Sequence, residues 1–186
     1  MNILVGICGS IGVLGIHAYL IRLAAEPGVR VRAMMTPTAA RIVNPAAIGA
    51  VVGSPVLSDL WQKDKAITPS LMLGDTDVLL LAPASANTIG LCAVGTASNI
   101  VSACYLAHRG ATVVAPSMAP QILCHRAVRR NIQTLIGDGV RVLPTGDGFV
   151  ASTGQWSTGQ WSAGALCDYH QLLAAVLGAT AAHTPD

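Results

Sequence analysis

The sequence predicts a single α/β domain built on a doubly wound, mostly parallel sheet of the Rossmann type. Short apolar runs alternate with segments of helical periodicity along most of the 186 residues. The runs are continuous rather than alternating, as in parallel strands that are buried on both faces. Glycine, serine and threonine follow several runs, where such folds place their loops. We take residues 1–186 as one domain, with a glycine-rich C-terminal lid at about 146–164 and a tail at about 179–186.

The first unit predicts a strand, a glycine turn and a helix. Residues 2–8 (NILVGIC) form a short apolar run that ends at Gly9-Ser10. The apolar residues that follow recur at helical spacing and share one helical face. These residues are Ile11, Leu14, Ala18 and Ile21.

A second unit repeats this order. Residues 29–35 alternate Val and Arg before turning apolar, which is typical of a strand. The segment Thr36-Pro37-Thr38 then opens a helix that runs to Val43, because proline is favoured in a first helical turn. Asn44-Pro45 opens another short helix in the same way.

Two further strands are predicted in the middle of the chain. Residues 77–82 (DVLLLA) are the most strand-like run, short, continuous and apolar. Ser98 is a candidate N-cap for a helix that reaches His108, with Gly110 just beyond its end. Residues 111–115 (ATVVA) supply the next buried strand.

The C-terminal third completes the alternation. A helix is expected at about 121–136, a strand at 140–143 and a closing helix at 165–178.

The segment 146–164 differs from the rest because it is rich in Gly, Ser and Thr and holds the tandem repeat GQWST-GQWSA. A flexible surface loop is one interpretation. The other is a hairpin lid that turns near residues 157–159 and carries Trp156 and Trp161, because two indoles are costly to leave in water. The lid interpretation makes both tryptophans candidate substrate-binding residues.

Composition limits the possible partners. Charged residues make up only 11% of the chain, against about 25% in globular proteins, so part of the surface is expected to be buried in a homo-oligomer. The net charge of +2 without a basic stripe argues against nucleic-acid binding.

The uncharged segment 1–21 is broken by four glycines and lacks a basic flank, which argues against a signal peptide or membrane span. Five scattered cysteines without a C-x-x-C pair indicate a reduced, cytoplasmic protein without a metal site.

Four loops are expected to meet at the carboxyl edge of the sheet, where such folds bind ligands. They are residues 9–11, 36–38, 83–88 and 116–119. Their serine and threonine hydroxyls stand beside helix N-termini, which suits a phosphate dianion. The first turn reads G-x-x-G-x-x-G rather than G-x-G-x-x-G, and Met34-Met35-Thr36 replaces the usual ribose-binding acid, so NAD is disfavoured. A mononucleotide such as FMN fits better.

These loops resemble those of the homo-oligomeric flavin-containing cysteine decarboxylases, which include phosphopantothenoylcysteine decarboxylase and the peptidyl-cysteine decarboxylases of lanthipeptide maturation. Residues 9–11 (GSI) and 35–40 (MTPTAA) are similar to the first two phosphate turns of that family. Residues 82–89 (APASANTI) resemble its A-P-A-T-A-N-T-I motif, and 95–102 (GTASNIVS) resemble its G-I-A-D-N-L-L-S. Residues 148–152 (GFVAS) are similar to its substrate clamp.

The resemblance implies a flavodoxin-like flavoprotein fold with FMN as the cofactor. It also implies trimers, which can build dodecamers, as the assembly. The residues implied in cofactor binding are Gly9, Ser10, Ile11, Thr36, Thr38, Pro83, Ala84, Ser85, Ala86, Asn87, Thr88, Ser117 and Met118.

The chain departs from the family at both polar catalytic positions. The family's active-site His falls on Pro69, and its P-A-M-N-x-x-M-W motif reads PSMAPQIL here, so the Asn is Ala119. The catalytic residues therefore stay unassigned. This combination most resembles the peptidyl-cysteine decarboxylases of linaridin biosynthesis, of the cypemycin type.

The function that this resemblance implies is FMN-dependent oxidative decarboxylation of the C-terminal cysteine of a ribosomal precursor peptide. The product is an aminoenethiol, which becomes S-aminovinyl-cysteine. An inactive FMN-binding regulator and a phosphopantothenoylcysteine decarboxylase are the alternatives. A prenyl-transferring flavoprotein is disfavoured by the 82–89 motif.

Overall fold

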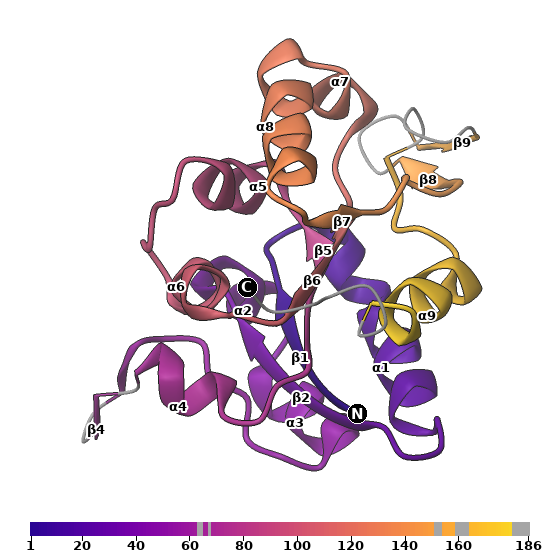
Figure 1. The fold of residues 1–186 in the computed structure, drawn as a ribbon. Helices are drawn as coiled ribbons and strands as arrows, with labels where there is room; N and C mark the ends of the chain where they lie inside the picture. Colours follow the sequence, from indigo (N-terminus) through magenta and orange to yellow (C-terminus); the bar gives the residue numbers. More distant parts are fainter. Residues whose placement is uncertain (63–64, 67, 151–153, 159–163, 180–186) are drawn as a thin grey trace.

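The computed structural model of the chain describes residues 1–62, 65–66, 68–150, 154–158 and 164–179. Their central feature is a five-stranded parallel sheet (Figure 1). Its strands, in order across the sheet, are β2 (Arg30–Met35), β1 (Asn2–Ile7), β5 (Val78–Ala84), β6 (Ala111–Pro116) and β7 (Arg141–Val142). Numbered along the chain, these strands have the order 2-1-3-4-5, which is that of flavodoxin-like folds. The predicted fold class is confirmed.

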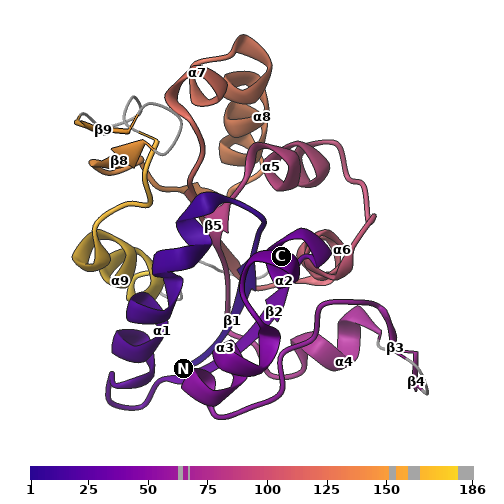
Figure 2. The ribbon, with the colours of Figure 1, turned by 180° about the vertical axis from the view of Figure 1, so that it is seen from behind.

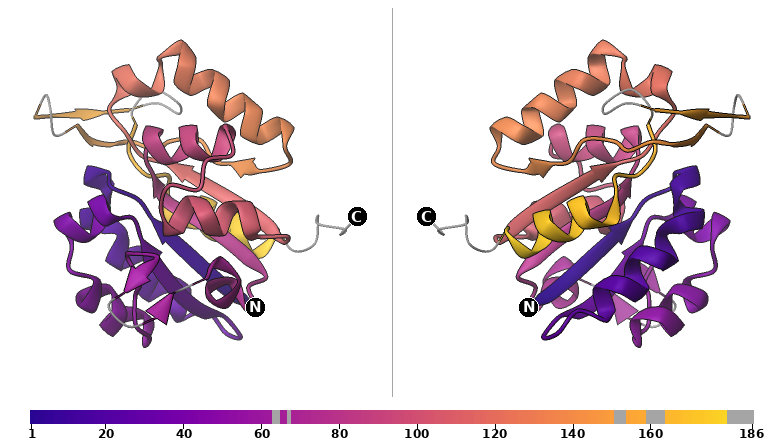
Figure 3. Two further views of the ribbon diagram at one scale, coloured as in Figure 1. Left: turned by 90° about the vertical axis from the view of Figure 1, so that its left-hand side faces the viewer. Right: turned by 90° about the vertical axis from the view of Figure 1, so that its right-hand side faces the viewer.

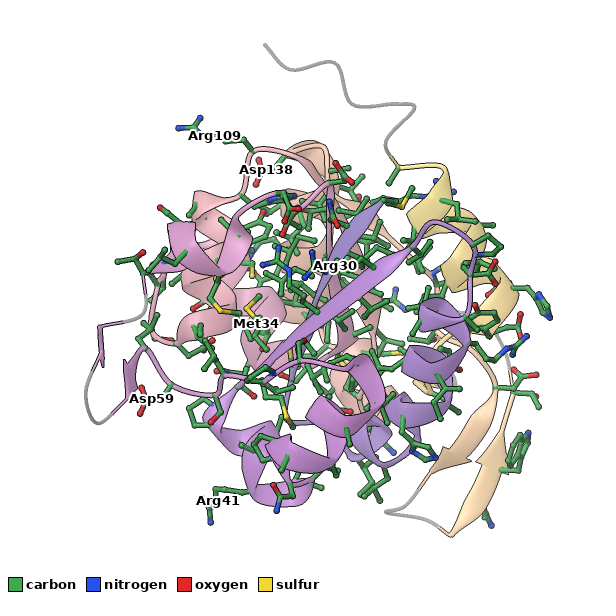
Figure 4. The ribbon with its side chains drawn as sticks, turned by 90° about the horizontal axis from the view of Figure 1, so that it is seen from below. Arg30, Met34, Arg41, Asp59, Arg109 and Asp138 are labelled. Atoms are coloured by element: carbon green, nitrogen blue, oxygen red, sulfur yellow. The ribbon has the colours of Figure 1, made fainter. Side chains whose placement is uncertain are left out.

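Helices pack on both faces of the sheet, as Figures 1 and 2 show from opposite sides. One face is covered by α1 (Ile16–Ala24), α3 (Pro45–Val52) and α9 (Tyr169–Leu177). The other is covered by α4 (Pro69–Leu73), α5 (Ala86–Ala93), α6 (Ile100–Ala107) and α8 (Arg126–Gly137). Successive strand residues point to opposite faces, so Ile3 and Val5 join the first core and Leu4 joins the second. Figure 4 shows Met34 inside the molecule and Arg41 and Arg109 at its periphery.

The remaining elements are short. Three of them follow strands β1, β2 and β6: the 3₁₀ helix η1 (Ile11–Gly15), α2 (Pro37–Ile42) and α7 (Pro120–Leu123). Two antiparallel hairpins add β3 (Trp61–Gln62) with β4 (Lys65–Ala66), and β8 (Gly148–Val150) with β9 (Gln155–Ser157). In the described residues no helix is both long and apolar enough to span a bilayer.

Most predicted helices begin at a polar cap. Thr36 and Asn44 cap α2 and α3 as the sequence indicates, each accepting a hydrogen bond from a backbone N–H of the first turn. The predicted cap Ser98 is wrong by one residue. Asn99 caps α6 because its side chain accepts from the N–H groups of Val101 and Ser102, while Ser102 completes a capping box.

The predicted helix at 121–136 is in fact two helices. The chain leaves the helical conformation at His125, whose backbone is extended and whose Nδ1 accepts from the N–H of Ala127. A cap inside a periodic segment therefore separates α7 from α8.

The apolar stripe predicted for the first helix faces outward rather than into the core. Ile11, Leu14 and Ile21 are 57%, 55% and 53% exposed, whereas Ile16 and Leu20 on the opposite side are buried. This segment has apolar residues on two sides, and helical periodicity alone does not show which side packs into the core of the domain. The exposed residues can pack against another molecular surface.

The described part of 146–164 contains a pairing that the sequence did not predict. Phe149 pairs with Trp156 and Val150 with Gln155, so the first copy of the repeat pairs with the strand upstream of it. Gly154, just before β9, has a left-handed backbone with φ +66°. The predicted turn at 157–159 extends beyond the described residues and stays a prediction. Trp161 lies outside the described residues. The hairpin strands project from the body of the molecule (Figure 3), and closure of a lid over a ligand therefore stays a proposal.

Candidate functional site

A cavity of about 610 Å³ opens at the carboxyl edge of the sheet. Its size falls within the range of small-molecule sites, about 300–1,000 Å³. The lining residues come from six segments: Gly9, Ser10, Ile11, Thr36, Pro37, Thr38, Ser85, Ala86, Asn87, Thr88, Ser98, Asn99, Ser117, Met118, Ala119 and Ile122. The four loops that the sequence places at this edge therefore do converge.

Their convergence follows from the strand order. β1 and β5 are neighbours at the centre of the sheet, and the chain leaves them toward opposite edges, so their following loops separate and leave a crevice. The loops after β2 and β6 close its two sides.

Three of the helix N-termini at the cavity have a hydroxyl cap. The Ser10 Oγ accepts from the N–H of Gly12 at 3.2 Å, the Thr36 Oγ1 from Ala39 at 3.2 Å and the Ser85 Oγ from Thr88 at 3.4 Å. Such ends present further N–H groups and positive dipole ends, which stabilise an anion.

The loop after β6 is fixed by backbone hydrogen bonds on both sides. The N–H of Ser117 donates to the Ala84 carbonyl, and the N–H of Met118 donates to the Gly164 carbonyl, each at 2.9 Å. Ser117 is only 2% exposed, and its Oγ lies 3.2 Å from the Ser10 Oγ. The first and fourth loops are thus joined directly.

Within the described residues, the cavity lining contains hydroxyl, amide and apolar side chains but no titratable group. Cys8, just before the first loop, is buried beneath it, and burial raises the pKa of its thiol to about 11 despite hydrogen bonds from the 85–88 loop. This thiol is therefore protonated at neutral pH and does not act as a base. The arrangement can bind an anion, donate hydrogen bonds and exclude water, but it has no proton acceptor of its own near neutrality.

The matching family model is described as Flavoprotein and covers residues 1–180. The chain belongs to the Flavoprotein family. The family resemblance expected from the sequence is thus confirmed at the level of the Flavoprotein family.

This flavoprotein is similar to proteins of coenzyme A biosynthesis and to decarboxylases. The coenzyme A biosynthesis bifunctional protein CoaBC of Bacillus subtilis (strain 168) is 30% identical over 152 residues, which are 81% of this chain and 37% of that protein. The chain thus spans under two fifths of that relative. The mersacidin decarboxylase of Bacillus sp. (strain HIL-Y85/54728) is 33% identical over 138 residues, 74% of this chain and 70% of the relative. The crystal structure of the FMN-dependent cysteine decarboxylase SpaF has a TM-score of 0.80 at 29% identity and covers 98% of both chains.

Eleven of the thirteen residues expected to bind the cofactor line the cavity of this flavoprotein. Pro83 and Ala84 do not, because both belong to the buried end of β5. Their carbonyls instead accept from the N–H groups of Cys8 and Ser117, so they hold the first and fourth loops in place.

Sequence reasoning missed three lining residues, Ser98, Asn99 and Ile122. A signal for the first two was available, because the 95–102 segment matches a family motif that ends at the start of a helix. Ile122 had no signal, since it lies on the short α7, which the sequence predicts as part of a longer helix.

The positions of the missing catalytic groups differ in their surroundings. Ala119 lines the cavity. Pro69 begins α4, where its carbonyl lies 4.0 Å from the Cys104 Sγ of α6, and it is not a lining residue. Trp156 is 69% exposed and is likewise not among the lining residues. These placements leave the catalytic group unassigned.

Gly164 is required by the loop that holds Met118. Its φ is +77°, and a Cβ there would lie 2.0 Å from the Met118 carbonyl oxygen, a backbone atom that cannot rotate away. We expect Gly164→Ala to lower the free energy of unfolding by about 3 kcal/mol or more, because strain and overlap add. Urea unfolding measures this.

Gly154→Ala is the matched control, since Gly154 has φ +66° but nothing within 4 Å of its Cβ position. It should cost only the left-handed backbone strain, about 1–2 kcal/mol. Equal losses in the two variants would contradict the close contact at Gly164.

Proposed function

We propose that the cavity binds FMN through the four loops. The donor set suits the phosphate, because hydroxyls and N–H groups at helix starts replace the Lys or Arg that the lining lacks. Ile11, Met118 and Ile122 supply apolar surface for a flat ring. The cavity volume of about 610 Å³ also suits a mononucleotide.

We further propose that the protein oxidatively decarboxylates the C-terminal cysteine of a precursor peptide. The terminal cysteine loses carbon dioxide together with two electrons and two protons, and becomes an aminoenethiol that can form S-aminovinyl-cysteine. When bound, FMN accepts those two electrons. The residues of the chain would bind the peptide end, hold its Cβ against the ring and exclude water.

The observation that carries this proposal is a cavity rich in hydrogen-bond donors and without an acid–base side chain in its described lining. A cysteine thiol has a reference pKa of about 8.5, so an appreciable fraction ionises near neutrality without a strong base. Donors that stabilise the thiolate suffice, whereas chemistry that must deprotonate a weak acid does not fit this lining. The relatives named above support a cysteine substrate.

A phosphopantothenoylcysteine substrate is the second candidate, because CoaBC proteins are among the relatives. Two features argue against this substrate. Pro69 and Ala119 stand where the resembled family has its catalytic His and Asn. The hairpin of β8 and β9 also suits a longer substrate. An inactive flavin-binding regulator is the third.

Incubation of the FMN-loaded protein with peptides that end in cysteine separates these functions. Mass spectrometry should show loss of carbon dioxide plus two hydrogens from the peptide, and no change in a matched peptide that ends in serine. Turnover of phosphopantothenoylcysteine alone would establish the second candidate. Inactivity on every peptide, with activity restored in Pro69→His/Ala119→Asn, would establish the inactive regulator.

We also propose that the protein works as a homo-oligomer, as trimers and dodecamers built from them. The exposed stripe of Ile11, Leu14 and Ile21 supports a subunit interface, and Ile11 also lines the cavity, so this surface continues into the site. Low charge content is consistent with such burial.

Leu14→Glu should therefore reduce the mass in solution to that of smaller species, because a carboxylate would be buried in the interface. Light scattering coupled to size exclusion measures this. Leu177→Glu, at an exposed leucine on α9, is the control and should assemble like the parent. An unchanged mass of Leu14→Glu would exclude the stripe as the interface.

A further inference from the structure

Ser117 differs from the other buried hydroxyls of the cavity. The Thr36 hydroxyl is occupied as a helix cap, and the Thr88 hydroxyl lies 3.3 Å from Ser85, the cap of its own helix. Ser117 caps no helix. Its hydroxyl contacts a side chain 107 residues away in the chain, Ser10.

The contact orients the Ser117 proton. The Ser10 Oγ accepts from the N–H of Gly12, and its own proton is donated to the Ser117 Oγ at 3.2 Å. A hydroxyl has one proton to donate, and that of Ser117 is then left for a partner in the cavity. Hydrogen bonds in such a chain polarise one another, which strengthens the last donor.

The backbone holds this donor in one place. Hydrogen bonds at Ser117 and Met118 fix the loop on both sides. At Gly12, a Cβ would lie 2.6 Å from the Ser117 Oγ, so a glycine leaves the space that the hydroxyl needs. A fixed donor in a buried site costs little reorganisation when charge develops beside it.

The loop after β6 carries its polar side chain at Ser117, two positions before Ala119. Where the resembled family reads P-A-M-N, this chain reads Pro116-Ser117-Met118-Ala119. Ala119 offers only a methyl group to the cavity, while Ser117 adds a hydroxyl to it. Loss of one hydrogen-bonding side chain thus accompanies gain of another in the same loop.

We propose that the Ser117 hydroxyl donates a hydrogen bond to the thiolate sulfur of the substrate cysteine, with Ser10 as its positioning residue. This inference rests on the proposed function. Ser117 acts as a donor and not as a base, because an alcohol does not ionise near neutrality.

Titratable and charged groups lie on the elements around the cavity, but none of them is a lining residue: Cys8, His17 and Tyr19 on α1, Arg41 on α2, Cys92 on α5, Cys104 and Tyr105 on α6, Cys124, His125, and Arg126, Arg129 and Arg130 on α8. The substrate thiol should therefore be the group whose ionisation sets the pH dependence of turnover. A donor to its thiolate lowers its pKa in the complex, and loss of that donor raises it.

Ser117→Ala tests the proposal. We expect kcat per bound FMN for a cysteine-ended peptide to fall about tenfold near neutrality, because a thiol pKa raised by about one unit lowers the thiolate fraction tenfold below the midpoint. The midpoint of the kcat–pH profile, which reports the bound complex, should move upward toward the free thiol value of about 8.5. Thr145→Val is the matched control, since Thr145 is a buried hydroxyl outside this cavity with no hydrogen-bond partner among the described residues. It should change neither kcat nor the midpoint.

A second measurement does not depend on turnover. A peptide amidated at its terminal cysteine cannot lose carbon dioxide, and its thiolate beside oxidised flavin should produce long-wavelength absorption. The absorption should appear at lower pH in the parent than in Ser117→Ala. Equal midpoints in both proteins, or a kcat within twofold of the parent, would overturn the role of Ser117. Absence of decarboxylation by the parent itself would instead refute the proposed function and leave this binding test standing.

Discussion

Ser85→Trp should yield a protein without bound flavin. Ser85 lines the cavity and caps α5, so an indole at this position would both fill the cavity and remove a hydroxyl from the helix start. The expected result is loss of more than nine tenths of the flavin absorbance per subunit, about a tenfold effect or greater, with the fold retained. The ratio of visible to ultraviolet absorbance after purification measures it.

Thr68→Trp is the matched control for the lost cap. Thr68 caps α4 through the same bond, in which its Oγ1 accepts from Leu71 N–H at 3.4 Å, but it lies outside the cavity. It should keep its flavin. A fully loaded Ser85→Trp protein would show that the cofactor does not occupy this cavity.

Deletion of residues 154–163 should lower peptide decarboxylation about 1,000-fold or more while folding and flavin content stay largely intact. The base of the segment lies outside the deletion, because Gly146 N–H donates to the Ala165 carbonyl and Gly164 holds Met118. The deletion removes Trp156, whose exposed indole is the best candidate to cover a peptide end. Positioning and exclusion of water account for effects of this size.

Trp156→Ala provides the finer comparison for the deletion. It should raise KM for the peptide at least tenfold, because the proposed contact between the indole and the peptide is lost. Flavin content should change little, because an exposed side chain contributes little to the fold. Steady-state kinetics and flavin absorbance measure both variants. Unchanged turnover of the deletion variant would show that the segment is only a linker. Loss of both flavin and the oligomer would show that the segment packs between subunits.

The position of the site could be predicted because it depends on strand order more than on side-chain detail. Continuous apolar runs such as 77–82 identify buried parallel strands, and loops after such strands share one edge. The hydroxyls of Ser10, Thr36 and Ser85 follow directly from this rule. Only the structure shows that these three residues both cap helices and line the cavity.

What could not be predicted depends on partners that are distant in sequence. The stripe at Ile11 and Leu14 has the periodicity of a core face, yet a second apolar side at Ile16 and Leu20 takes the core. Likewise, nothing within the tandem repeat indicates that Trp156 pairs with Phe149, upstream of the repeat. The contact between Ser10 and Ser117 joins segments that no local pattern relates.

The hydrogen bond from Met118 to Gly164 also couples the proposed binding of FMN to the proposed binding of a peptide. Met118 lines the cavity, and Gly164 ends the segment that carries the hairpin. A cofactor that stabilises the Met118 loop therefore stabilises the base of the hairpin, and a peptide that orders the hairpin tightens the hold on the cofactor by the same factor. If FMN and a cysteine-ended peptide bind as proposed, the dissociation constant of FMN should be lower in the peptide complex than in the free protein.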